Sequence, residues 1–349
     1  MPGHETRVQL RPRPARLAWQ WKLTDPAQQP VESAAPGQWR APMNEVFTLT
    51  DYSAGLASAG PGRIDAHVQL WQLPVRDQRW TAGLPPLRRD YRLDELRHWL
   101  AAAGVQTAVL VQTVQVAAET PEMLAIADAA DEIAGVVGWV DLCAADVAGR
   151  LASLTEGSDG CWLTDIRHGV QDEHDPDWLR PEALRGLQAI ADAGLVYDVL
   201  VRSDQLLIAG RAARRWPGLR FVLDPGGKPP IASSAMDPWR QHVNELAGCP
   251  NVAAKLSGLL TEAGPGVDAR TLRPYSDHLL GAFGPGRTMF GSGWPVSTPR
   301  AGHSRVVVLT AERPGGLSSD RQAKVFGTTA AAWYGFGATD HDRAGRPCG

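Results

Sequence analysis

The chain has 349 residues, of which 44% are hydrophobic and 21% charged, and its formal net charge is -3. This length suffices for one large core or two ordinary domains, and the balanced charge disfavours nucleic acid or an anionic membrane surface as a partner. Four scattered cysteines without a C-x-x-C pair disfavour a disulfide framework, so a cytoplasmic location is expected. No apolar run approaches the roughly 20 residues that span a bilayer, and no secretory signal is recognisable.

Residues 1–62 lack a sustained hydrophobic period and are rich in Pro, Gly, Ala and Gln. This composition predicts an irregular N-terminal extension. Trp19, Trp21 and Trp39 indicate that part of the extension packs against another surface. At the other end, we expect residues 337–349 to form a flexible tail.

From residue 63 onward, short β-rich apolar runs alternate with stretches of helical period. The runs predict eight strands, over residues 63–71, 107–114, 134–142, 161–168, 195–201, 220–224, 251–258 and 287–293. The stretches between and after them predict helices over residues 93–104, 123–132, 146–154, 181–194, 204–216, 237–248, 272–284, around 300–312, and 319–335. Pro181 marks a helix start, and Gly104 marks a helix end.

Eight strands that alternate with helices over residues 63–336 are typical of a (β/α)8 TIM barrel, an α/β fold. A doubly wound open sheet is the alternative. Such a sheet would normally carry a glycine-rich phosphate turn after its first strand. The first predicted strand, RIDAHVQLW, is followed instead by a polar turn that contains tryptophan. We therefore favour the barrel.

In the first predicted strand, polar residues alternate with apolar ones. His67 and Gln69 are two residues apart, so they share one face of a strand. A His-x-His pair at this position would suggest a metal site, but the second residue is an amide. In a barrel, functional groups gather at the C-terminal ends of the strands. The candidates there are His67, Gln69, Trp71, Gln112, Arg167, His168, Asp224, Lys228, Lys255 and Trp294.

The chain contains seven segments in this order: DAHVQLW, VVGWVDL, IRHGVQDEHDPDWL, GLVYDVLV, FVLDPGGKPPI, NVAAKLSGL and FGSGWPV. Together they resemble the amidohydrolase-related proteins of the amidohydrolase superfamily, and the sugar-lactonase-like branch in particular. The resemblance covers roughly residues 63–336. It implies a distorted TIM barrel that hydrolyses sugar lactones or related cyclic esters. Many members carry one divalent metal ion, often zinc, and some related lactonases are thought to work without it.

Three residues depart from the family pattern, and all three fall on its metal chemistry. The family motif D-x-H-x-H ends here in Gln69, L-D-H-x-x-K-P has Pro225 in place of its histidine, and G-S-D-W-P has Gly293 in place of its aspartate. That aspartate is normally the general base of the family. A catalytic zinc typically has three protein ligands, and proline and glycine side chains offer no donor. The resemblance with these losses therefore implies a degenerate metal site, with no metal or other cofactor.

Five of the candidates have side chains that could act on the reacting groups. We assign proton transfer to His67, His168 or Asp224, and stabilisation of negative charge to Arg167 and Lys255. A structural role is the alternative for most of them: a hydrogen-bonded core histidine, a histidine that caps a loop, an arginine paired with aspartate, or an aspartate that caps the following Gly-Gly turn. Lysine is costly inside an apolar strand unless it is paired, which favours a place for Lys255 in the pocket.

We assign substrate binding to Arg167 and Lys255 as well as to the remaining five candidates. Lys228 would bind an anionic group or form an ion pair at the rim. Trp71 and Trp294 would form walls of the substrate pocket or fill the core. Gln69 and Gln112 complete the predicted binding set.

These observations predict a metal-independent enzyme on an amidohydrolase or lactonase scaffold. Its substrate would be a small cyclic ester or a related ring compound, changed by hydrolysis or by cyclisation, elimination or isomerisation. The alternative is a non-catalytic pseudoenzyme that binds a small ligand or a protein partner. A third interpretation retains a metal on His67, Asp165 and His168. No nucleic-acid or membrane partner is expected, and the sequence leaves a homo-oligomer open.

Overall fold

The computed structural model describes residues 62–173, 178–263, 267–299 and 317–336. The expected extension, apart from Gly62, lies outside the described residues, and so do the expected tail at 337–349 and the helix expected around 300–312.

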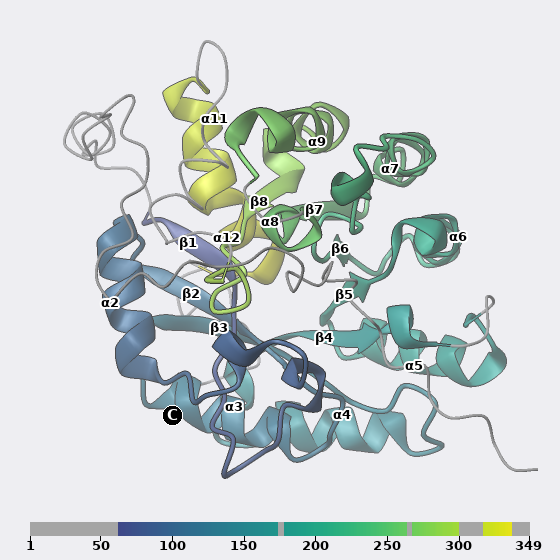
Figure 1. Ribbon diagram of the computed structural model, residues 1–349. Helices are drawn as coiled ribbons and strands as arrows, with labels where there is room; N and C mark the ends of the chain where they lie inside the picture. Colours follow the sequence, from purple (N-terminus) through teal and green to yellow (C-terminus); the bar gives the residue numbers. More distant parts are fainter. Residues whose placement is uncertain (1–61, 174–177, 264–266, 300–316, 337–349) are drawn as a thin grey trace, which may run out of the picture. The chain divides into compact units, whose positions relative to one another are not determined.

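Eight parallel strands form one sheet in the order of the sequence. The strands are β1 Ile64–Val68, β2 Thr107–Val111, β3 Ile133–Gly138, β4 Leu163–Gly169, β5 Val196–Leu200, β6 Phe221–Leu223, β7 Val252–Leu256 and β8 Thr288–Phe290. A bridge between Val68 and Trp294 brings the first and last strands together. The fold is therefore the predicted (β/α)8 barrel (Figure 1). Most of the strands stop before the predicted ends, because the last polar residues of those segments belong to the loops of the barrel mouth.

Helices surround the sheet on the outside, as Figure 1 shows. They are α2 Leu93–Ala103, α3 Glu119–Asp128, α4 Val147–Thr155, α5 Pro181–Asp192, α6 Leu206–Arg215, α7 Trp239–Ala247, α8 Leu259–Glu262, α9 Ala269–Phe283, α11 Ser319–Ala323 and α12 Thr329–Tyr334. Pro181 opens α5, and Gly104 ends α2 in the left-handed conformation with φ of 61°, as expected. In the described part of the chain, no helix is long and apolar enough to cross a bilayer.

Three helices differ from the sequence prediction. Helix α3 begins at Glu119, four residues before the predicted start. The carboxylate of this first residue accepts hydrogen bonds from the backbone N–H groups of Thr113 and Val114 in the preceding loop. The expected helix over 319–335 is divided by a π-helical turn at Lys324–Thr328. The four-residue helix α8 was not predicted.

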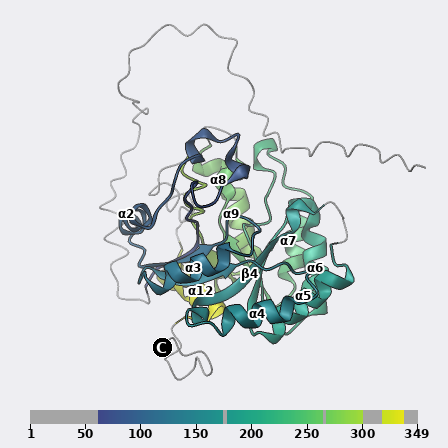
Figure 2. The same ribbon diagram turned by 90° about the horizontal axis from the view of Figure 1, so that it is seen from below.

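The interior of the barrel is apolar near the N-terminal ends of the strands. The side chains that pack there are Ile64, Ala66, Val109, Val111, Val137, Val196, Val222, Ala253, Met289, Ala330 and Tyr334. The last two belong to α12, so this helix covers the N-terminal end of the barrel. Figure 2 shows α12 and α8 at opposite ends. The other end of the barrel, the mouth, is formed by the C-terminal ends of the strands and the loops that follow them.

A β-bulge in β1 sets the direction of its side chains. Between Asp65 and Val68 the pairing with β2 slips by one residue. Ala66 belongs to the interior cluster, whereas Val68 packs between the strands and the helices. The bulge therefore turns His67 into the barrel beside Ala66. Simple alternation along the strand would not predict two successive inward side chains.

Candidate active site

His67 and Asp224 form a buried pair at the C-terminal ends of β1 and β6. Nδ1 of His67 lies 2.6 Å from Oδ1 of Asp224, and the two residues are 6% and 0% exposed. We assign the proton to Nδ1, which donates it to the carboxylate and leaves Nε2 as the acceptor. No side chain or backbone group among the described residues occupies Nε2. The imidazole can therefore take a proton from a group in the mouth.

Asp224 is also held by two cations. Its Oδ2 lies 3.0 Å from Nη1 of Arg167 and 3.3 Å from Nζ of Lys255. Burial would raise the pKa of Asp224, but the contact with His67 and the charges of Lys255 and Arg167 together hold that pKa well below its usual range. Burial also lowers the pKa of His67, against the opposing effect of Asp224. Asp224 is therefore an ionised partner that orients a neutral imidazole, and it does not serve as the base itself.

Lys255 lies deeper in the barrel than the pair of His67 and Asp224. Its side chain is fully buried, and Nζ lies 2.5 Å from Oδ2 of Asp198 on β5. The hydroxyl of Tyr334 on α12 lies 3.4 Å from the other oxygen of Asp198. The sequence placed Lys255 among the substrate-binding residues, but the structure does not bring its ammonium group to the mouth. Asp198 and Tyr334 were missed as site residues; an acid at an inward position of a buried strand was the available signal for Asp198.

Arg167 connects three strands. Its Nη2 donates a hydrogen bond to the carbonyl oxygen of Gln112 after β2. Nε2 of Gln69 donates to the same oxygen at 3.0 Å. Oε1 of Gln112 is buried without a hydrogen-bond partner in the described structure. The structure thus brings Gln69, Gln112 and Arg167 together beside Asp224. A group without a partner there is available to a ligand.

His168 is not part of this cluster. It follows Arg167 on β4, so the two side chains point to opposite faces of the strand. Nε2 of His168 lies 2.8 Å from Oε1 of Glu173. The structure therefore gives His168 a partner in its own loop and does not bring it to His67. For the same reason, His67, Asp165 and His168 do not form a common metal site.

Trp71 and Trp294 pack in an aromatic chain instead of standing open at the mouth. They are 5% and 3% exposed. The ring centroid of Tyr91 lies 4.8 Å from that of Trp71 and 5.5 Å from that of Trp294. Trp80 packs edge-on against Trp71 at 5.6 Å and is 39% exposed. Both predicted walls are therefore core residues here. The exposed ring of Trp80 was not singled out from the sequence.

Lys228 lies on the turn after β6 and is half-buried. Its φ is 46°, which is unusual for a residue with a side chain. Burial lowers the pKa of Lys228, and the nearby acids Glu262 and Asp172 oppose that effect. Within the described ranges its ammonium group has no ion-pair partner. It remains a candidate for substrate binding at the rim.

Ser257 and Gly291 lie next to His67 and were not among the predicted site residues. A Cβ added to Gly291 would lie 2.8 Å from Cβ of His67 and 3.2 Å from Oγ of Ser257. Only glycine at position 291 therefore lets the backbone after β8 approach the side chains of His67 and Ser257. Oγ of Ser257 is buried and has no hydrogen-bond partner in the described structure.

The described residues do not fit a catalytic metal ion. They contain no group of three or more His, Cys, Asp or Glu side chains placed to hold one. Where the carboxylates of Asp198 and Asp224 come near each other, Nζ of Lys255 contacts both. Gln69 directs its amide nitrogen to a backbone oxygen, and Gly293 has no side chain to offer. The usual minimum of three protein ligands is not assembled.

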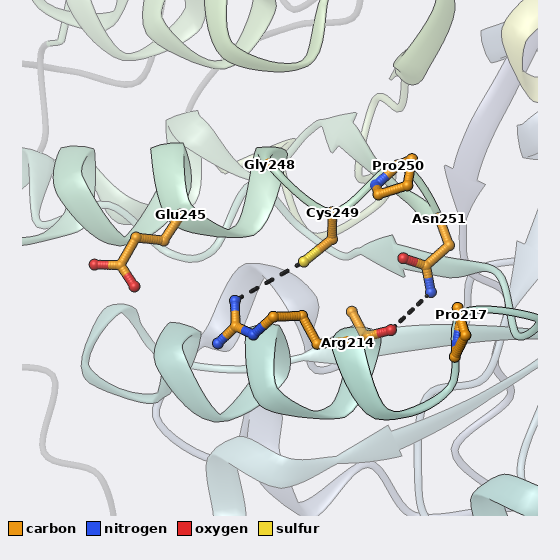
Figure 3. A pocket seen from close by; sticks show the side chains of 8 residues that line it. Arg214, Pro217, Glu245, Gly248, Cys249, Pro250 and Asn251 are labelled. Atoms are coloured by element: carbon orange, nitrogen blue, oxygen red, sulfur yellow. Dashed lines mark hydrogen bonds between the residues drawn. The ribbon is translucent and has the colours of Figure 1, made fainter.

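One further cavity lies away from this site. It has a volume of about 350 Å³ and lies where α6 and α7 end, beside Arg214, Glu245 and Cys249 (Figure 3). Nη1 of Arg214 lies 4.0 Å from Sγ of Cys249, and Asn251 donates to the carbonyl oxygen of Ala213. None of the predicted site residues lines it. This cavity is therefore separate from the His67 cluster.

The chain is similar to known proteins over the whole barrel. The family model described as Amidohydrolase matches residues 64–336. An L-fucono-1,5-lactonase of Burkholderia ambifaria is 38% identical over 279 residues, which are 78% of this chain and 95% of that protein. An L-fucono-1,5-lactonase of Burkholderia multivorans is 37% identical and covers 79% of this chain and 96% of its own length. The crystal structure of an amidohydrolase from Burkholderia multivorans with bound zinc has a TM-score of 0.73 and 36% identity, and covers 78% of this chain and 99% of its own.

Proposed function

We propose that this chain, which belongs to the amidohydrolase family and is a hydrolase-like enzyme, hydrolyses a small cyclic ester without a resident metal ion. The pair of His67 and Asp224 carries the proposal: it presents an uncommitted imidazole nitrogen, oriented by a buried carboxylate, at the barrel mouth. Two relatives, at 38% and 37% identity, bear the name L-fucono-1,5-lactonase. They support a sugar-acid lactone as the first substrate to test.

In this mechanism His67 acts first as a base. Nε2 removes a proton from a water molecule as the water oxygen bonds to the lactone carbonyl carbon. Asp224 keeps the proton on Nδ1 and stabilises the imidazolium that forms, as the aspartate of a Ser-His-Asp triad does. Base catalysis of this kind typically contributes about 10²- to 10⁴-fold in rate.

His67 then acts as an acid. When the tetrahedral intermediate collapses, the bond between the carbonyl carbon and the ring oxygen breaks. The proton on Nε2 passes to that ring oxygen, which leaves as a hydroxyl group. The product carries a carboxylic acid and an alcohol, and His67 is neutral again. Gln112 and Ser257, which have buried polar atoms without partners, are suited to hold hydroxyl groups of the substrate.

The donor set supports metal independence. Gly293, which follows β8, stands where the family has its aspartate. In the described structure the carboxylate that pairs with His67, that of Asp224, also forms ion pairs with Arg167 and Lys255. A related amidohydrolase, 36% identical, has been crystallised with zinc, so zinc is the first ion to test.

Substitution of the base tests the proposal. We expect His67→Asn to lower kcat for a sugar-acid 1,5-lactone by about 10²- to 10⁴-fold. His98→Asn is the matched control, because His98 lies on the exposed face of α2. We expect His168→Asn to have a much smaller effect than His67→Asn, because His168 pairs with Glu173. Full activity of folded His67→Asn would contradict the proposal.

Product analysis separates hydrolysis from the other ring reactions that the same base could serve. Hydrolysis in ¹⁸O-labelled water places one labelled oxygen in the carboxylic acid. An elimination or isomerisation product would carry no label. A panel of lactones that gives only unlabelled products would overturn hydrolysis while leaving the acid–base role of His67 in place.

A further inference from the structure

A series of buried polar side chains connects the N-terminal end of the barrel to His67. It begins at Tyr334 on α12, whose hydroxyl lies 3.4 Å from Oδ1 of Asp198. Oδ2 of Asp198 lies 2.5 Å from Nζ of Lys255, and Nζ lies 3.3 Å from Oδ2 of Asp224. Asp224 in turn bonds Nδ1 of His67. None of these five residues is more than 6% exposed.

Burial prevents Lys255 from touching a substrate in the mouth. The residue is 0% exposed, and its ammonium group contacts two carboxylates and lies 5.7 Å from the ring centroid of Tyr334. An ammonium group without partners would be very costly at such a position, and here the ion pairs offset that cost. Lys255 can therefore influence the reaction only through the groups that it holds.

We propose that Lys255 is a positioning residue that fixes the carboxylate of Asp224, so that Asp224 holds His67 in the orientation and tautomer used on the substrate. Lys255 and Arg167 approach the same oxygen of Asp224 from β7 and β4, which leaves the other oxygen to His67. The carboxylate cannot rotate without breaking one of these contacts. The kinetic consequences of this inference rest on the proposed function.

The charges around His67 also give Lys255 a measurable electrostatic effect. The charged groups that face His67 are Asp224 from β6, Arg167 from β4 and Lys255 from β7. The carboxylate favours the imidazolium, whereas the two cations oppose it. Removal of the charge on Lys255 therefore raises the pKa of His67. A lysine with a packing role alone would not have this effect.

The test replaces Lys255 by methionine, which is of similar length and uncharged. For Lys255→Met we expect kcat for the lactone to fall about 10²-fold while KM changes by less than about threefold. The substitution alters the orientation of the His67 imidazole and leaves the groups that bind the substrate in place. An NMR titration of the His67 imidazole should show a higher pKa than in the unmodified protein, because a positive charge near the ring has been removed. Lys324→Met is the matched control, because Lys324 pairs with Asp320 on the surface.

Two results would overturn the inference. A rise in KM with unchanged kcat would show that Lys255 contacts the substrate directly. An unchanged pKa of His67 in a folded variant would show that Lys255 serves packing alone. If Lys255→Met does not fold, the double variant Lys255→Met with Asp198→Asn removes both buried charges together. Its kcat and KM are read in the same way, and its His67 pKa should rise by less, because the loss of the Asp198 carboxylate opposes the loss of the ammonium group. The titration needs no turnover, so a failure of the proposed function stays distinguishable from a failure of this inference.

Discussion

Asp65 and Asp224 are both fully buried carboxyl groups, yet their surroundings differ. Three positively charged or protonatable groups surround Asp224. Asp65 has mainly backbone partners: its Oδ1 accepts hydrogen bonds from the N–H groups of Ser292 and His67 at 2.8 and 3.1 Å. Burial therefore dominates at Asp65 and raises its pKa from 3.8 to about 6. Through the hydrogen bond from Ser292, Asp65 links β1 to the segment that follows β8.

This shift at Asp65 makes stability depend on pH. The folded state keeps the proton at a pH where the unfolded chain has released it. The contribution of Asp65 to stability is therefore greatest below pH 3.8 and is lost as the pH rises to about 6 and beyond. Between pH 4 and 8, we expect the unfolding free energy of the unmodified protein to fall by about 2.5 kcal/mol relative to Asp65→Asn.

Urea denaturation at both pH values measures this difference. Asp192→Asn is a suitable reference, because it removes an exposed carboxylate at the end of α5. A difference between Asp65→Asn and the unmodified protein that does not vary with pH would show that Asp65 is not buried as described.

At the scale of elements, glycines show how conformation and space decide the effect of one methyl group. Gly149 lies within α4, and a Cβ added there would meet no atom within 4 Å. Gly104 ends α2 with φ of 61°, where an L side chain is strained. We expect Gly149→Ala to raise the unfolding free energy, and Gly104→Ala to lower it, by about 1 kcal/mol each. Denaturant unfolding of the two variants in parallel measures both, and equal signs would contradict the assigned conformations.

The elements that the sequence predicted best are those with a strong period of their own. The eight strands and helices such as α5 follow from alternating apolar runs and from stop and start residues. The first residue of α3, Glu119, accepts hydrogen bonds from the loop before the helix, and this contact leaves no periodic signal in the sequence. The π-helical turn at Lys324–Thr328 leaves no periodic signal in the sequence. Such details arise from tertiary contacts, which a local pattern does not contain.

At the scale of the whole molecule, the barrel could be predicted but the pairs across it could not. His67 and Asp224 are 157 positions apart, and Lys255 and Asp198 are 57 apart. The sequence identified His67, Asp224, Arg167 and Lys255 because polar groups at strand ends converge in a barrel. It did not reveal that Lys255 lies below Asp224. The bulge that turns His67 inward likewise could not be predicted from the sequence.

The central claim is that His67, oriented by Asp224, opens a lactone without a metal ion. Its most direct test measures the metal content and the lactonase activity of the same chelator-treated sample. We predict unchanged kcat/KM when far less than one metal ion per chain remains, and no gain when zinc is added back. Activity that disappears with the metal and returns in proportion to bound zinc would contradict the account.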